Sequence, residues 1–202
     1  MFDKVGEEIT LDEFVTQFTL DELMYIVGGQ KTTGVCNTGS FGGIDRLGIP
    51  YFPTADGPAG LRFRQELGLA ATAWPIASLL ACTWDKDVLY DYGVAVATEV
   101  KENNIGAWLA PGLNIHRNPL CGRNFEYYSE DPVVSGVMAA ATVKGVQSMN
   151  IAATPKHFAC NNKETNRQMS DSIVSERALR EIYIKGFEIA VKEADPWLIM
   201  TS

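Results

Sequence analysis

The chain has 202 residues, of which 46% are hydrophobic and 21% charged, and its formal net charge is −8 at pH 7. This length and composition indicate a globular protein with a hydrophobic core and exclude a disordered chain. The acidic balance, without a cluster of basic residues, argues against nucleic acid and anionic membranes as partners.

The first 30 residues are predicted to form two short helices. Thr10-Leu11-Asp12-Glu13 and Thr19-Leu20-Asp21-Glu22 are capping boxes, and each predicts the start of a helix. Gly28-Gly29 would end the second helix by supplying a left-handed cap. Residues 30–48 are rich in Gly, Thr and Asn, so we expect a loop there, with a flexible run at 39–43.

From residue 49 onwards, apolar strand-like runs alternate with polar loops and amphipathic segments. Five strands are predicted, at 49–55, in the stretch that ends near Cys82, and at 107–111, 151–155 and 197–201. This alternation predicts an α/β fold, a parallel sheet with helices outside it. The five predicted strands could form most of an open sheet or part of a barrel that is cut short. The end of the chain on an apolar strand favours the second, a partial TIM-like (β/α)8 barrel with about five parallel strands.

Three longer helices are predicted between these strands. Thr83 would cap the first, Pro132 would begin the second, and Ser175 would cap the third, which ends at Ala194. At helical spacing, the buried faces are predicted to carry Val88, Tyr92, Val96 and Val100, then Val134, Met138 and Ala141, then Leu179, Ile182, Tyr183, Gly186 and Ala190.

Polar residues are expected to gather beyond the carboxyl ends of the strands, where ligands bind in α/β folds. In a regular strand, the neighbours Lys156 and His157 would point to opposite faces, so the backbone must twist for both to serve one ligand. The candidate site residues are Asp56, Arg62, Arg123, Lys156, His157 and Arg167. This combination suits a ligand rich in hydroxyl groups, and it would also suit a phosphate.

Other features of the sequence bear on cofactors and location. No GxGxxG motif follows the first strand, and with only His116 and His157 a zinc site is not expected, so we predict neither cofactor nor metal. The four cysteines are widely spaced and lack a CxxC pair, which predicts reduced thiols. The start of the chain lacks the apolar segment of a secretory signal, and no run reaches membrane-spanning length, so a cytoplasmic location is predicted.

Six motifs between residues 45 and 202 occur together in one order. They are TADGPAGLR at 54–62, AWP at 73–75, LACTWD at 80–85, LAPGLNI at 109–115, GRNFEYYSEDP at 122–132 and KHF at 156–158. In content and order they resemble glycoside hydrolase family 3, the β-glucosidase type. The resemblance implies that residues 31–202 are an incomplete (β/α)8 glycosidase barrel that binds a terminal sugar at its rim, and that 1–30 are leading helices and a linker.

The resemblance also implies roles for the candidate residues. Asp56 resembles the family carboxylate that holds the outer hydroxyls of the terminal sugar. Arg62, Arg123, Lys156, His157 and Arg167 resemble the residues that grip the rest of that sugar. Peptide bonds around the Lys-His pair are often cis in this family, and we expect a cis bond at Lys156-His157 or His157-Phe158.

The chain departs from the family pattern at the catalytic groups. Retaining glycosidases need two carboxylates, a nucleophile and a general acid. The family nucleophile lies in a Ser-Asp-Trp-type motif, which is absent here, since 170–172 reads Ser-Asp-Ser. The general acid usually belongs to a separate domain. A branch that acts on N-acetylhexosamines takes its acid from a His on the loop after the Lys-His-Phe motif. That loop, 161–165, contains no His, and Glu164 is interpreted as a loop carboxylate that pairs with Arg167.

The resemblance therefore implies part of a retaining, exo-acting β-glucosidase that hydrolyses terminal non-reducing β-D-glucosyl residues. We expect no catalytic residue in this chain and no activity from the chain alone. Its partners would be a β-glucoside or oligosaccharide and the remainder of the same enzyme, either in the same polypeptide or as a separate chain. The alternatives are a sugar-binding module without catalysis, a β-xylosidase-type member of the family, and a different α/β enzyme that binds phosphate.

Overall fold

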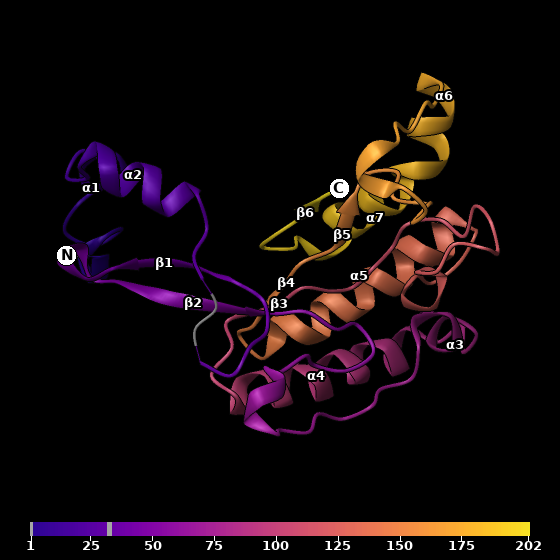
Figure 1. Ribbon diagram of the computed structural model, residues 1–202, viewed down its shortest axis with the longest axis horizontal. Helices are drawn as coiled ribbons and strands as arrows, with labels where there is room; N and C mark the ends of the chain where they lie inside the picture. The colour runs from indigo at the N-terminus through magenta and orange to yellow at the C-terminus, as the bar shows by residue number, and fades with distance from the viewer. Residues whose placement is uncertain (1, 32–33) are drawn as a thin grey trace.

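The computed structural model describes residues 2–31 and 34–202, and it has an α/β architecture (Figure 1). Strands β2 (Ile49–Ala55), β3 (Ala107–Trp108) and β4 (Ala152–Ala153) lie side by side and pair in parallel. Strands β5 (Lys156–Phe158) and β6 (Met200–Thr201) form a second parallel pair. The predicted α/β fold with parallel strands is confirmed, although most of the strands are shorter than predicted.

Strand β1 (Ser40–Ile44) corrects the prediction of a flexible loop over this region. It pairs antiparallel with β2, and the rings of Phe41 and Phe52 pack across the two strands with centroids 4.7 Å apart. Gly42 and Gly43 have φ values of 78° and 75°, a conformation that side chains rarely adopt. The glycine content suggested a loop, but Gly42 and Gly43 allow the distorted backbone of this strand, and the rings of Phe41 and Phe52 provide its packing.

The predicted strand that ends near Cys82 is wrong, because the chain forms helix α3 (Ala77–Ala81) instead. Ala77, Leu80 and Ala81 are its buried residues, at the three- and four-residue spacing of a helix. A short apolar run does not distinguish a strand from a buried helix by periodicity. The cap of the next helix also differs from the prediction, since Asp85 rather than Thr83 accepts the free backbone N–H groups.

Helices α4 (Lys86–Glu102), α5 (Pro132–Ser148) and α7 (Lys185–Ala194) pack side by side, with α5 in the middle (Figure 1). Pro132 is the first residue of α5, as predicted, and Asp131 caps it. A Cβ at Gly93 or Gly145 would collide with the backbone of the facing helix, so these glycines allow α4 and α5 to approach closely. The predicted core positions Tyr92, Val96, Val100, Met138 and Ala141 are buried, whereas Val88 is exposed.

The predicted helix from Ser175 to Ala194 is interrupted. The hydroxyl of Ser175 caps α6 (Glu176–Ala178), a π-helical turn follows at Leu179–Tyr183, and α7 completes the segment. Gly186 and Ala190 are buried as predicted, but Ile182 is exposed. The π turn changes the helical phase, which explains why one continuous face was not observed.

The amino-terminal helices α1 (Leu11–Val15) and α2 (Leu20–Val27) lie beside the β1–β2 hairpin, away from α6 and α7 (Figure 1). Both predicted capping boxes are present, and Gly29, with φ of 67°, follows the end of α2. Single 3-10 turns occur at Phe2–Lys4, Asp45–Leu47, Gln65–Leu67, Asn124–Glu126 and Arg167–Met169. Among the described residues, none of the helices combines the length and apolar character needed to span a bilayer.

Candidate functional site

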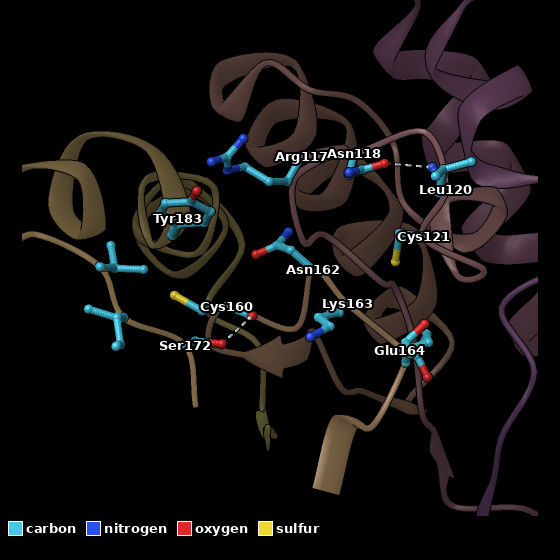
Figure 2. Close-up of a pocket in the computed structure, with 13 residues that line it drawn as sticks. Arg117, Asn118, Leu120, Cys121, Cys160, Asn162, Lys163, Glu164, Ser172 and Tyr183 are labelled. Carbon is cyan, nitrogen blue, oxygen red and sulfur yellow. Dashed lines mark hydrogen bonds between the residues drawn. The ribbon is translucent and has the colours of Figure 1, made fainter. Parts of the chain in front are cut away.

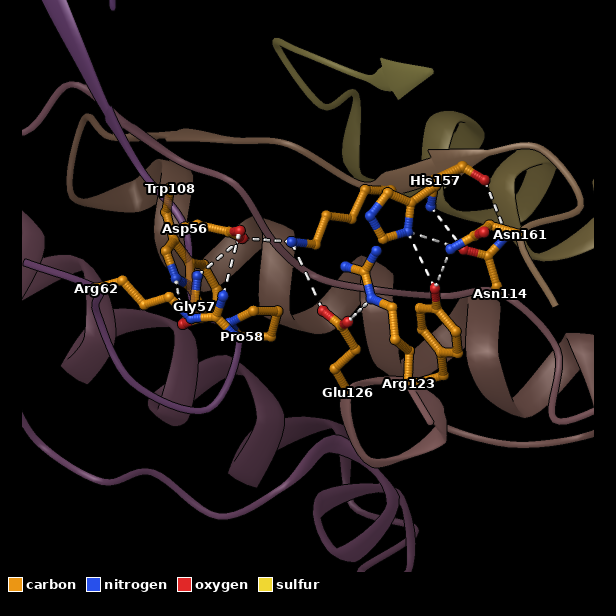
Figure 3. Close-up of polar contacts among 12 residues, drawn as sticks. Asp56, Gly57, Pro58, Arg62, Trp108, Asn114, Arg123, Glu126, His157 and Asn161 are labelled. Atoms are coloured by element: carbon orange, nitrogen blue, oxygen red, sulfur yellow. Dashed lines mark hydrogen bonds and ion pairs between the residues drawn. The ribbon is translucent and has the colours of Figure 1, made fainter. Parts of the chain in front are cut away.

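Asp56 and Lys156 form an ion pair within a polar cluster that also includes Glu126 and Arg123 (Figure 3). Asp56 follows β2 and Lys156 begins β5, and the Lys156 ammonium lies 2.5 Å from the Asp56 carboxylate. Arg62 contributes a second cation, 3.9 Å from the other carboxylate oxygen. The Lys156 side chain is 1% exposed and that of Asp56 is 30% exposed. The pair therefore presents a carboxylate at the surface of the site, with its counter-ion buried beneath.

A tight turn fixes the Asp56 carboxylate. The Gly57 N–H donates to Asp56 Oδ1 at 2.9 Å, and the Trp108 indole N–H donates to the Gly57 carbonyl at 3.2 Å. Gly57 has φ of 111°, and a Cβ there would collide with the Gly60 carbonyl. Burial by itself raises the pKa of Asp56, but Lys156, the Gly57 N–H and Arg62 outweigh it and lower the pKa overall. The carboxylate is therefore ionised and accepts hydrogen bonds.

Glu126 is the shared counter-ion of Arg123 and Lys156. Its buried carboxylate pairs with Arg123 Nε through one oxygen and lies 3.6 Å from Lys156 Nζ through the other. Burial alone would lower the pKa of Arg123, but the hydrogen bond that Arg123 donates to the Glu126 carboxylate raises it. The four groups Asp56, Lys156, Glu126 and Arg123 thus alternate in charge, which offsets the cost of removing them from water.

His157 is held by its backbone and by its ring. The Lys156-His157 peptide bond is cis, as expected, and so is Phe158-Ala159. The Asn114 side chain accepts the His157 N–H at 2.7 Å and donates to the His157 carbonyl at 2.9 Å. Burial and the nearby cations Arg123, Lys156 and Arg167 lower the pKa of His157 to about 3. The imidazole is therefore neutral at physiological pH.

A second set of polar contacts leads from His157 to the rim. His157 Nδ1 lies 3.1 Å from the Tyr127 hydroxyl, and the Asn161 amide nitrogen lies 3.0 Å from the same hydroxyl. Asn161 also contacts Glu164, whose carboxylate lies 3.6 Å from Arg167. The predicted pairing of Glu164 with Arg167 is confirmed.

These groups surround a pocket of about 690 Å³. Asp56, Arg123, Lys156, His157 and Arg167 all line it, so the structure brings five of the six candidate residues together. Arg62 lines a neighbouring hollow that Asp56, Arg123 and Arg167 share. In the part of the chain that the structure describes, no three His, Cys, Asp or Glu side chains are grouped to hold a metal ion.

Figure 2 shows a second pocket, of about 460 Å³, which shares part of its lining with the first. Cys160, Lys163 and Ser172 line both pockets, and Arg117 and Asn118 form part of the far wall of the second. Its lining mixes polar groups with the apolar side chains of Leu120, Ile173 and Val174.

The comparison with known proteins identifies the family. Residues 31–202 match the model of the glycosyl hydrolase family 3 N-terminal domain. The chain belongs to glycosyl hydrolase family 3. It is 56% identical over 196 residues to β-glucosidase A of Butyrivibrio fibrisolvens, a match that covers 96% of this chain and 24% of that protein. The chain thus spans about a quarter of the length of this family 3 relative.

Two solved family 3 structures show the same fold. A β-glucosidase from Paenibacillus barengoltzii superimposes with a TM-score of 0.94 at 46% identity, covering 100% of this chain and 22% of that one. β-Glucosidase 3B from Thermotoga neapolitana, solved in complex with glucose, gives a TM-score of 0.86 at 48% identity, covering 94% of this chain and 28% of that one. These likenesses confirm that the chain has the fold of a family 3 barrel domain.

Four residues of the polar cluster are not among the candidate site residues predicted from the sequence, namely Asn114, Glu126, Tyr127 and Asn161. All four lie within or beside the motifs that resemble the family. Their burial is the informative property, because a buried amide, carboxylate or hydroxyl requires a polar partner. The sequence does not show that burial directly.

Proposed function

We propose that this chain is the sugar-binding part of a retaining, exo-acting β-glucosidase that releases terminal non-reducing β-D-glucosyl residues. The observation that supports it most is the arrangement of Asp56, Lys156, Arg123 and His157 around one pocket in a family 3 chain. A fixed carboxylate beside several fixed donors matches the alternating hydroxyl groups of a sugar.

Each candidate residue has a chemical role in this proposal. Asp56 is ionised and accepts hydrogen bonds from two neighbouring hydroxyls of the terminal sugar. Lys156 and Arg123, both ion-paired, donate to sugar oxygens, and charge-assisted bonds of this kind are strong and directional. His157 contacts a further hydroxyl, and Arg62 and Arg167 hold the sugar from the exposed rim.

The nucleophile and the general acid are proposed to lie outside these 202 residues. Residues 31–202 would be an incomplete barrel and residues 1–30 its leading helices and linker. The chain spans only about a quarter of the relative's length, which is consistent with a larger enzyme. We propose that the remainder completes the pocket and that this chain alone does not hydrolyse glucosides.

A mechanism-based inhibitor tests the proposal in the full-length protein. An activated 2-deoxy-2-fluoro-β-glucoside should form a covalent glycosyl-enzyme, because retaining hydrolysis proceeds through that intermediate. Peptide mass spectrometry should place the adduct on a carboxylate outside residues 1–202. An adduct on Asp56, Glu126 or Glu164 would overturn the division of roles. Anomeric retention in the released sugar is the matching check on stereochemistry.

Kinetic and binding measurements on the full-length protein distinguish the alternatives. Comparison of kcat/KM for aryl β-glucosides and aryl β-xylosides decides between the glucosidase and the xylosidase type. Sugar binding by the full-length protein without turnover would indicate a binding module. Ordered binding of inorganic phosphate without affinity for glucose would indicate a phosphate site.

A further inference from the structure

A directional chain of hydrogen bonds ends at His157. It begins at Glu164, whose carboxylate oxygen lies 3.1 Å from the side-chain nitrogen of Asn161. The Glu164 oxygen accepts in this contact, so the Asn161 amide is oriented with its NH2 group toward Glu164.

The Asn161 NH2 group has a second contact, 3.0 Å to the Tyr127 hydroxyl. An amide nitrogen can only donate, so the Tyr127 oxygen accepts here and retains its own proton for another partner. The other contact of this hydroxyl is His157 Nδ1, at 3.1 Å (Figure 3). Burial raises the pKa of Tyr127, so the hydroxyl keeps its proton at neutral pH.

The opposite arrangement would place a proton on Nδ1 and direct it to Asn114 Oδ1. That contact is longer, 3.3 Å, and Asn114 Oδ1 already accepts the His157 backbone N–H at 2.7 Å. The Tyr127 proton would then lose its acceptor in a buried setting, which is unfavourable for a hydroxyl. The contacts therefore favour an unprotonated Nδ1.

We propose that Tyr127 is a positioning residue that holds His157 in the neutral tautomer with its proton on Nε2. The inference rests on the proposed function and deepens it. His157 Nε2–H donates a hydrogen bond to a sugar hydroxyl oxygen, and the ring does not accept a hydrogen bond from a sugar hydroxyl. Nδ1 is occupied by Tyr127, which leaves Nε2 for a ligand in the pocket that His157 lines. The low pKa of His157 agrees with a neutral ring.

Nitrogen NMR tests the tautomer in the full-length protein with selectively labelled histidine. The His157 signals are assigned by their loss in His157→Gln. We expect Nδ1 at the chemical shift of an unprotonated imidazole nitrogen and Nε2 at that of a protonated one. In Tyr127→Phe the two shifts should move toward each other or exchange, because Nδ1–H can then donate to Asn114.

Tyr128→Phe is the matched control. It removes a hydroxyl from the adjacent buried ring, where the hydroxyl bonds Thr142 at 2.9 Å instead of His157. The His157 shifts should not change in this variant. A protonated Nδ1 in the unaltered protein, or unchanged shifts in Tyr127→Phe, would overturn the proposal. This readout does not need catalysis, so it can fail while glucoside hydrolysis stands, and the reverse also holds.

Substrate analogues test the direction of the hydrogen bond. In these analogues one hydroxyl of the glucoside, at position 3, 4 or 6, is replaced by hydrogen or by fluorine. Neither substituent can donate a hydrogen bond, but fluorine can accept one and hydrogen cannot. At the position that contacts His157, the fluoro substrate should lose less kcat/KM than the deoxy substrate, and this difference should disappear in Tyr127→Phe. We expect kcat/KM for the parent glucoside to fall about tenfold in Tyr127→Phe and less than about twofold in Tyr128→Phe. Equal losses for fluoro and deoxy substrates at every position would contradict the donor role.

Discussion

The ammonium of Lys156 and the carboxylate of Asp56 lie 2.5 Å apart, although 100 residues separate them in the chain. Both residues line the pocket, but the lysine side chain is buried and the aspartate is partly exposed, so the pair links the interior of the domain to the pocket. Each charge offsets the cost of desolvating the other.

Asp56→Asn should lower kcat/KM of the full-length enzyme on an aryl β-glucoside by about a hundredfold. A neutral amide accepts more weakly and opposes Lys156 less well, and a loss of about 3 kcal/mol of transition-state binding corresponds to that factor. Asp91→Asn, an exposed aspartate on α4, is the control and should retain full activity. Unaltered kcat/KM in Asp56→Asn would refute a sugar-binding role for Asp56.

Glu126→Gln should destabilise the barrel by about 2–4 kcal/mol, because Arg123 and Lys156 then lose the negative charge that offsets the cost of burying them. Glu188→Gln is a matched control, since Glu188 also pairs with two cations, Lys185 and Lys192, but on an exposed helix surface. Exposed pairs contribute little, so its melting midpoint should not change measurably. The two variants are compared by thermal denaturation of the full-length enzyme. Equal midpoints would show that Glu126 is not a structural counter-ion.

His157 should make the protein less stable as pH falls between about 6 and 4. Its pKa of about 3 lies below the ordinary value, so in this window the unfolded state binds a proton that the folded state does not. The linkage slope approaches about 1.4 kcal/mol per pH unit for one proton. Asp56, whose pKa is also lowered, contributes stability that is present above about pH 4 and is lost only below it.

Denaturation of the full-length protein at several pH values measures this slope. In His157→Asn the slope of the unfolding free energy against pH between pH 6 and 4 should be smaller by up to about 1.4 kcal/mol per pH unit, the contribution of one proton. Asparagine does not titrate in this range. Identical slopes for the two proteins would mean that the folded His157 also takes up a proton in this range.

Gly145→Ala should destabilise the contact between α4 and α5 by about 1–3 kcal/mol, because its Cβ would meet the Tyr90 carbonyl and the backbone of Gly93. Gly122→Ala is the control, since no atom lies within 4 Å of a Cβ there. The denaturation midpoints of the two variants give the comparison. A Gly145→Ala protein as stable as Gly122→Ala would contradict the close helix packing.

Local sequence patterns were sufficient for much of the fold. The capping boxes at Thr10 and Thr19, the start of α5 at Pro132 and the strand at 49–55 were predicted correctly. These features depend on residues close together in the chain, whose backbone hydrogen bonds and spacing are local. The polar residues at strand ends were also identified, because parallel strands bring their carboxyl ends to one edge.

The tertiary structure decided what local patterns left open. The glycine-rich β1 is a strand because β2 pairs with it, and 77–81 is a helix because its apolar residues are buried at helical spacing. The partners of Lys156 and of His157 come from distant segments, so Glu126 and Tyr127 acquire their roles only once the chain has folded. The sequence thus determined which charged groups could line the site. Packing determined which of them are buried and paired, because burial and long-range contacts fix the cost of each charge and the direction of each hydrogen bond.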